Sequence, residues 1–218
     1  MSDLYTPPAD TGLELIYLDQ YLVVVSKPSG LLSVPGRGED KQDSLLVRVQ
    51  NRYPDALVAH RLDRDTSGLI VFPRGAKVHR QLSMMFEKRD MQKSYVAVVL
   101  GKLEPETGEV NLPLCVDWPN RPLHMVDHQN GKPAITRYHV LNYDPLTTRS
   151  RVALEPVTGR THQLRVHMQA LGHPIVGDTL YGGNPLGNEP RLLLHAHTLD
   201  FAHPVTGKPL ELEAPLHF

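Results

Sequence analysis

The sequence predicts an α+β fold of mixed, mainly antiparallel sheets with flanking helices. Strand-length apolar runs such as "LVVV" and "YVAVVL" recur along the chain, separated by turns rich in Gly, Pro and Asp. Apolar residues at helical spacing occupy only a few segments. Strands in meanders and hairpins with helices packed against them define this class. Since the chain shows no internal repeat and no linker, we expect a single domain over residues 1–218.

The strands are expected where apolar residues cluster between turn signals. The first two are joined by a tight turn near Asp19 and Gln20. Residues 104–133 contain several prolines and little periodicity, so we expect an irregular excursion there. The expected strands cover residues 13–19, 21–28, 69–72, 92–103, 134–144, 150–159, 191–204 and 209–215.

Three helices are expected from capping and apolar spacing. The segment 43–54 offers Asp43 or Ser44 as N-cap and Pro54 as terminator. The segments 75–90 and 160–172 are amphipathic, and Gly172 is placed to cap the second of them. Their apolar stripes are Val78, Leu82, Met85 and Phe86 in the first, and Leu164, Met168 and Leu171 in the second.

Composition excludes several classes of protein. One cysteine, Cys115, cannot form an internal disulfide or a cysteine metal cluster, which fits a reducing compartment. The N-terminal residues lack the basic and apolar regions of a secretory signal, and the apolar runs are too short to span a bilayer. We therefore expect a cytoplasmic protein without membrane association.

Charge is unevenly distributed although the net charge is only -1. Residues 1–20 carry four acids and no Lys or Arg, whereas residues 60–93 carry eight Lys/Arg against four acids. Residues 147–170 carry four Arg against one Glu. Such basic segments can form a cleft for a polyanion, and they can equally be solvated helix faces.

The sequence gives little support for a metal site or for a catalytic nucleophile. His195 and His197 share one face of an expected strand, and His162 lies five residues before His167, but no fixed acid or cysteine completes either pair. Hydrogen-bonded histidines are the favoured interpretation, and we expect no metal. A G-x-S-x-G motif and a P-loop are both absent from the sequence.

The stretch "AHRLDRDTSGLIVF" is the strongest candidate site. Asp63 lies between Arg61 and Arg64, just before a strand. A surface ion pair would contribute only about 0–1 kcal/mol, so stability gives little reason for the cluster. A carboxylate kept ionised by arginine and shielded from water is a usable nucleophile or base. Asp65 is the competing acid.

Five segments resemble, in order, the motifs of the RluA-type family of pseudouridine synthases. They cover residues from about 20 to 205. "HRLDRDTSGLIVF" resembles the signature around the catalytic aspartate, and "VVSKPSGLLSVPG" the lysine-proline motif. "KSYVAVVLG" resembles the tyrosine motif, "GRTHQLRVHMQALGHPIVGD" the arginine motif, and "LLLHAHTLDFAHP" the C-terminal strand.

The resemblance implies the pseudouridine synthase fold, with a central RNA-binding cleft, and isomerisation of uridine in RNA without any cofactor. It places Asp63 at the essential aspartate, Arg165 at the arginine that pairs with it, and Tyr95 at the tyrosine that packs on the target base. Leu164 falls on the apolar residue lining the base pocket, and Arg61 on the residue that fills the space of the flipped base. His60 is a further candidate for substrate binding.

The expected partners are 23S ribosomal RNA and transfer RNA stem-loops. "LCVDWPNRPLHMV" resembles the short, dual-specificity branch of the family, and too few residues precede the first strand for an N-terminal S4-like domain. We expect one catalytic domain acting as a monomer, with Trp118 and Arg121 as candidates for RNA contact or for a structural turn. The alternatives are an enzyme with a single RNA target, a non-catalytic RNA-binding module, and a metal-dependent hydrolase.

Overall fold

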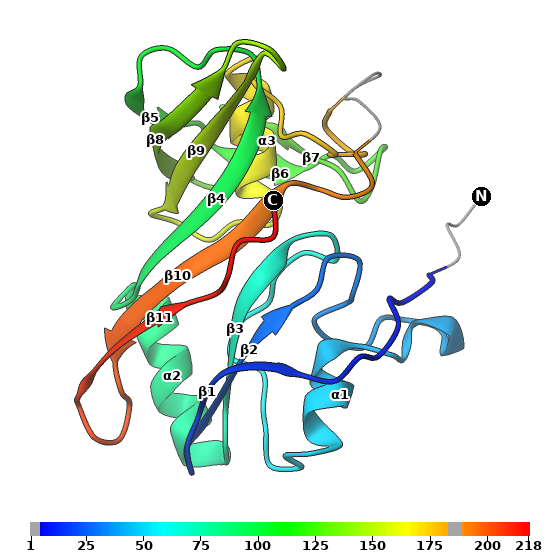
Figure 1. The fold of residues 1–218 in the computed structure, drawn as a ribbon, viewed down its shortest axis with the longest axis vertical. Helices are drawn as coiled ribbons and strands as arrows, with labels where there is room; N and C mark the ends of the chain where they lie inside the picture. The colour runs from blue at the N-terminus through cyan, green and yellow to red at the C-terminus, as the bar shows by residue number, and fades with distance from the viewer. Residues whose placement is uncertain (1–4, 183–188) are drawn as a thin grey trace. The chain divides into compact units, whose positions relative to one another are not determined.

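The structure, a computed structural model, describes residues 5–182 and 189–218 (Figure 1). By its internal contacts the chain divides into two compact units. The first comprises residues Met1–Lys93 and His195–His217, and the second comprises Ser94–Leu194 with Phe218. That the whole chain acts as one catalytic domain stays a prediction.

The first unit is built on a mixed sheet in the order β1-β2-β3-β10, with β11 pairing with β10. All these pairs are antiparallel except β3 with β10, which is parallel. Asp19 forms the predicted turn between the first two strands, because its Oδ1 accepts from the N–H groups of Tyr21 and Leu22. The strands are β1 (Glu14–Leu18), β2 (Leu22–Lys27), β3 (Ser67–Pro73), β10 (Leu194–Ala202) and β11 (Pro209–Glu213).

Both helices expected in this unit form, although α1 is shorter than the expected segment 43–54. A short 3-10 helix, η1 (Glu39–Lys41), precedes α1 (Leu45–Gln50), and Ser44 rather than Asp43 caps α1. The helix α2 (Ala76–Lys88) buries its predicted stripe in a core with β2, β3 and β10. That core contains Leu22, Val24, Leu69, Val71, Val78, Leu82, Leu199, Phe201, Leu212 and Ala214.

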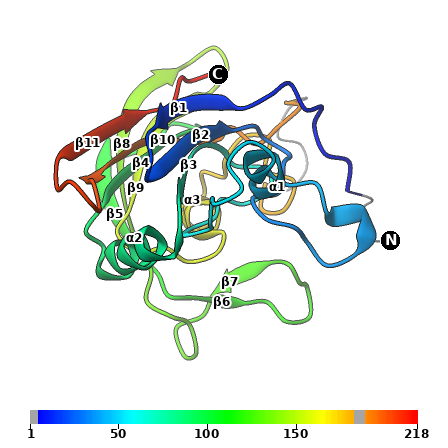
Figure 2. The same cartoon turned by 90° about the horizontal axis from the view of Figure 1, so that it is seen from below.

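The second unit holds an antiparallel sheet in the order β4-β9-β8-β5. Its strands are β4 (Gln92–Leu100), β9 (Arg149–Pro156), β8 (Ile135–Asp144) and β5 (Thr107–Asn111). A separate hairpin pairs β6 (Leu114–Val116) with β7 (His124–Val126), and Figure 2 shows it apart from the strands of the second unit's sheet. The helix α3 (Gln163–Ala170) packs between the sheet strands β8 and β9 and the hairpin strand β7 (Figure 1).

The expectation of an irregular segment over 104–133 is wrong, since three strands form there. Their pattern was hard to recognise because β5 buries only Val110, and β6 and β7 have three residues each. Edge strands of this length leave too few apolar residues for an alternating signal.

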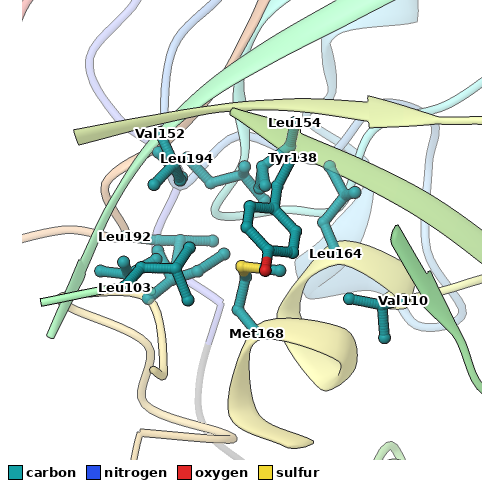
Figure 3. Packing of buried hydrophobic residues seen from close by; sticks show 12 residues of the cluster. Leu103, Val110, Tyr138, Val152, Leu154, Leu164, Met168, Leu192 and Leu194 are labelled. Carbon is teal, nitrogen blue, oxygen red and sulfur yellow. The ribbon is translucent and has the colours of Figure 1, made fainter. Parts of the chain in front are cut away.

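The helix α3 ends as the sequence predicts. Gly172 has φ +83, and its N–H donates to Gln169 O while His173 N–H donates to Met168 O. These two bonds form a Schellman cap. Leu164 and Met168 point into a core that includes Tyr138 and Leu154 (Figure 3), whereas Leu171 is exposed and leaves the predicted stripe one residue shorter.

Candidate active site

Asp63 lies on the loop that leads into β3, which we call the aspartate loop (His60–Thr66). From Arg61 to Asp63 burial alternates: Arg61 is exposed, Leu62 is buried and Asp63 is partly buried. This alternation is that of an extended segment, in which residues two apart share a side. Arg61 and Asp63 therefore face away from the core that holds Leu62.

The loop at residues 28–33 forms hydrogen bonds with the backbone of the aspartate loop. Ser33 Oγ donates to Leu62 O at 2.7 Å and accepts from Leu62 N–H at 3.1 Å. Gly30 N–H donates to Arg64 O at 2.9 Å, and Ser29 Oγ donates to Asp65 O at 2.7 Å. Contacts on both sides of Asp63 thus fix the path of the chain, as a preorganised site requires.

We call these contacts between the two loops the clamp. Lys27 is its central residue, and the Lys27 side chain is fully buried. Its Nζ donates to the carbonyls of Arg64 and Leu31 at 2.7 Å and of Pro28 at 2.9 Å. Burial lowers the pKa of Lys27 from 10.5 to about 7, against the opposing effect of Asp65 and Asp63. Lys27 therefore joins the two loops, and its charge interacts with the carboxylates of Asp65 and Asp63.

The buried ammonium predicts a specific pH dependence of stability. Between pH 7 and 10.5 the folded protein has already released the Lys27 proton that the unfolded chain still holds, so stability rises with pH. We expect the free energy of unfolding of the parent to rise by up to about 1.4 kcal/mol per pH unit relative to Lys27→Met. Urea unfolding from pH 6.5 to 9.5 measures this, with the exposed Lys208→Met as control. Parallel curves for the parent and Lys27→Met would contradict it.

His60 anchors the beginning of the aspartate loop. Its Nε2 accepts from Val71 N–H at 3.0 Å, and its ring stacks on Phe86 with centroids 4.5 Å apart. Burial, and then the charge of Lys93, lower the pKa of His60 to about 3. The imidazole is therefore neutral, and it is engaged in contacts with Val71 and Phe86. Its predicted role in substrate binding stays a prediction.

The competing acid, Asp65, is engaged in a pair of its own. Arg64 Nε donates to its Oδ1 at 2.9 Å, and Arg64 Nη2 donates to its Oδ2 at 3.2 Å. Both carboxylate oxygens of Asp65 thus face one guanidinium. This bidentate pair engages both carboxylate oxygens of Asp65 in hydrogen bonds with its neighbour in the sequence.

Arg165 lies on α3 in the second unit and is buried, with 2% of its side chain exposed. Its Nε and Nη2 donate to Asp178 Oδ2 and Oδ1 at 2.8 and 2.7 Å. Asp178 is fully buried, and its Oδ1 also accepts from the N–H groups of Leu180 and Tyr181. A bidentate pair with these added bonds holds the guanidinium plane in one orientation.

Tyr181 completes the surroundings of Arg165, whose guanidinium carbon lies 5.2 Å from the ring centroid of Tyr181. The Tyr181 hydroxyl oxygen accepts from His124 N–H at 2.8 Å and lies 2.7 Å from His162 Nδ1. Because His162 occupies the N-cap position of α3 and His124 begins β7, one hydroxyl joins the helix to the hairpin.

Tyr95 and Leu164 lie in the same unit as Arg165. Tyr95 is partly buried on β4, opposite Leu154 of β9, and packs against the core of this unit. Leu164 belongs to that core with 7% exposure (Figure 3). The structure thus groups Tyr95, Leu164 and Arg165 in the second unit and His60, Arg61 and Asp63 in the first.

Sequence reasoning assigned no role to Lys27, Asp178 or Tyr181. The first two lie inside the lysine-proline and arginine motifs, so the motifs were the available signal. The sequence did not show that Lys27 and Asp178 are buried, because a charged side chain is normally expected at the surface.

Histidines form hydrogen bonds within the fold, as the favoured interpretation expected. His195 Nδ1 lies 2.9 Å from Ser67 Oγ, His197 Nδ1 3.0 Å from Ala214 O, and His167 Nδ1 2.9 Å from Thr136 Oγ1. Among residues 5–182 and 189–218, no three His, Cys, Asp or Glu side chains gather in a metal-binding arrangement. Within the same ranges, every helix is too short or too polar to cross a membrane.

Comparison with known proteins identifies close relatives. The chain is 49% identical over 215 residues to the dual-specificity RNA pseudouridine synthase RluA of Escherichia coli K12, covering 98% of both chains. The Pasteurella multocida protein of that name gives the same identity and coverage. The fold is similar to human RNA pseudouridylate synthase domain containing 1, with a TM-score of 0.80 at 28% identity over 98% of this chain and 87% of that one.

The family description "RNA pseudouridylate synthase" matches residues 21–170, which include Lys27, Asp63, Tyr95 and Arg165. Together with relatives of nearly the same length, this match shows that the chain belongs to the RNA pseudouridylate synthase family.

Proposed function

We propose that this chain isomerises specific uridines in both 23S ribosomal RNA and the anticodon stem-loop of transfer RNA. Family membership gives the reaction class, and the observation that supports Asp63 as its catalytic carboxylate is the clamped loop. Asp63 is partly exposed, beside an exposed arginine, while Lys27, Ser29, Gly30 and Ser33 hold the backbone around it.

Asp63 has two possible routes of action. Cleavage of the N-glycosidic bond develops positive charge on the sugar, which a carboxylate stabilises. The carboxylate then either attacks the sugar covalently or removes a sugar proton. Both routes need a carboxylate in a fixed position, and the hydrogen bonds of the clamp fix the backbone on both sides of Asp63.

The second unit contributes three residues to the proposal. Arg165 takes the role of the family's catalytic arginine, as the resemblance implies, and its pairing with Asp178 fixes the orientation of its guanidinium group. Tyr95 offers a flat face to uracil, and Leu164 lines the base pocket. No metal or organic cofactor enters this scheme, and we propose a cytoplasmic monomer.

Double specificity is supported by the names of the relatives, which are called dual-specificity RNA pseudouridine synthases. Recognition in this proposal relies on the shape of a small stem-loop and a few splayed bases, as the resemblance to the short branch of the family implies.

Release of tritium from uracil C5 tests the function, because C5 loses its hydrogen when it becomes bonded to the sugar. Stem-loop transcripts from both RNAs, labelled at C5, are incubated with the purified protein. Release from both supports the proposal, and release from one only supports the single-target alternative. Binding without release would indicate a non-catalytic module, and loss of release in excess chelator would indicate metal-dependent chemistry.

Arg61 is predicted to act in turning out the target base. Flipping costs a few kcal/mol of stacking and pairing, part of which a stacked guanidinium can offset. We expect Arg61→Ala to slow reaction about tenfold more on a paired target than on the same stem-loop with the target unpaired. The exposed Arg52→Ala removes one positive charge of the same unit as control and should affect both substrates equally. Equal rate ratios for Arg61→Ala would exclude a role in extrusion.

A further inference from the structure

We propose that Trp118 and Arg121, in the turn between β6 and β7, form a stacking platform for one unpaired base of the substrate RNA other than the target uridine. This inference rests on the proposed function, because it needs a stem-loop with a splayed base. We call the two residues the hairpin platform.

The first observation is the exposure of Trp118, which is 69% exposed. It is the only tryptophan in the sequence. Arg121, also exposed, places its guanidinium carbon 4.6 Å from the centre of the indole ring. An indole held in water with a planar cation over one face retains its other face as a broad flat surface, which is the chemistry that binds bases by stacking.

The second observation is that the turn is ordered by its own hydrogen bonds. Asp117 N–H donates to Leu123 O at 2.9 Å, and Leu123 N–H donates to Asn120 O at 3.0 Å. Asn120 is held to Asp117 by both its backbone N–H and its side-chain amide. The backbone of these residues therefore forms a structural turn, but the indole of Trp118 is exposed to solvent. A preformed turn loses little entropy on binding a base.

The third observation links the platform to the arginine of α3. Leu123 and Val126 pack in a small core with Val166 and Tyr181, and His124 N–H donates to the Tyr181 hydroxyl. The same Tyr181 ring lies under the Arg165 guanidinium. A base bound at the platform is thus held by the β6–β7 hairpin, which packs against Tyr181 next to Arg165, a proposed active-site residue. This arrangement favours the substrate RNA as the occupant.

The surroundings favour a nucleobase over a protein. Pro119, Asn120 and Arg121 next to the indole are exposed, so a single aromatic ring stands among polar and small side chains. Protein interfaces need a contiguous apolar patch, whereas one flat ring with one cation matches the area of one base. Since every base has a π-face, the platform would tolerate different loop sequences, as an enzyme with two RNA targets requires.

Intrinsic fluorescence tests the inference directly, because all tryptophan emission comes from Trp118. Binding of each stem-loop is followed independently by the anisotropy of a dye on the RNA. We expect quenching of the emission that saturates with the anisotropy signal. Replacing loop nucleotides one at a time by abasic sites should abolish quenching at a single position, distinct from the target uridine, while RNA binding is weakened but measurable.

Variants give the matched comparison. Trp118→Ala is expected to weaken stem-loop binding about 5- to 100-fold, Trp118→Phe less, and Arg121→Gln by an intermediate factor. The control is Leu146→Ala, which truncates a 94% exposed apolar side chain in the turn after β8 and should bind like the parent.

Normal RNA binding without quenching, or Trp118→Ala binding like the parent, would overturn the platform while leaving the proposed function intact. Quenching lost at the target position alone would place Trp118 at the reacting base and would overturn it also. Failure of both RNAs to bind the parent would instead overturn the proposed function, and the platform with it.

Discussion

Asp63→Asn is expected to lower pseudouridine formation by at least about 1,000-fold while the protein still folds and binds stem-loop RNA. The amide is nearly isosteric with the carboxylate, but it carries no negative charge and is a far weaker base. Covalent attack and proton removal are therefore both lost. Tritium release from C5-labelled uridine measures the rate, and thermal unfolding together with RNA affinity shows that the variant is otherwise intact.

Asp65→Asn is the matched control for this experiment. Asp65 and Asp63 are neighbours on one loop, and both raise the pKa of the buried Lys27, with Asp65 having the larger effect. Either substitution therefore removes one negative charge near Lys27, and the electrostatic disturbance of the clamp is at least as large in Asp65→Asn as in Asp63→Asn. We expect Asp65→Asn to retain activity within about tenfold of the parent, because its carboxylate is engaged with Arg64.

Near-parental activity of Asp63→Asn would exclude Asp63 as the catalytic acid and make Asp65 the next candidate. Equal large losses in the two variants would mean that the loop needs both charges for its structure. Only the asymmetric result assigns the chemistry to Asp63.

Local signals in the sequence predicted the helices and most of the strands. The stripe of α2 and the glycine cap of α3 are encoded within one or two turns, so they could be read without knowledge of the fold. The strands β5, β6 and β7 could not, because their stability comes from pairing with partners and not from their own pattern.

The candidate site shows the same limit more sharply. The position of Asp63 was predicted from an acid among bases and from the resemblance. The buried state of Lys27 could not be, because one of its carbonyl partners, that of Arg64, lies 37 residues away in sequence. The burial of Arg165 could not be predicted either, because Asp178, the acid that offsets the cost of burying its charge, lies 13 residues later in the sequence.

This buried pair changes what Arg165 variants should do. Arg165→Met leaves the Asp178 carboxylate buried without its cation, which typically costs about 3–5 kcal/mol of stability. Loss of activity in that variant alone could therefore reflect unfolding. The double variant Arg165→Met/Asp178→Asn removes both charges, while the asparagine oxygen can still accept from the N–H groups of Leu180 and Tyr181.

We expect the double variant to recover more than about 1 kcal/mol of the lost stability and none of the lost activity, which should stay about 100-fold or more below the parent. Asp178→Asn alone should keep part of the activity, since Arg165 retains its charge but loses its bidentate anchor. Arg165→Lys should also keep only part of the parent activity, because an ammonium group lacks the planar, bidentate geometry of the guanidinium. Thermal unfolding and single-turnover tritium release, measured on all four variants and the parent, separate the two effects. If activity returned with stability in the double variant, Arg165 would be a structural partner of Asp178 and its charge would have no part in the isomerisation.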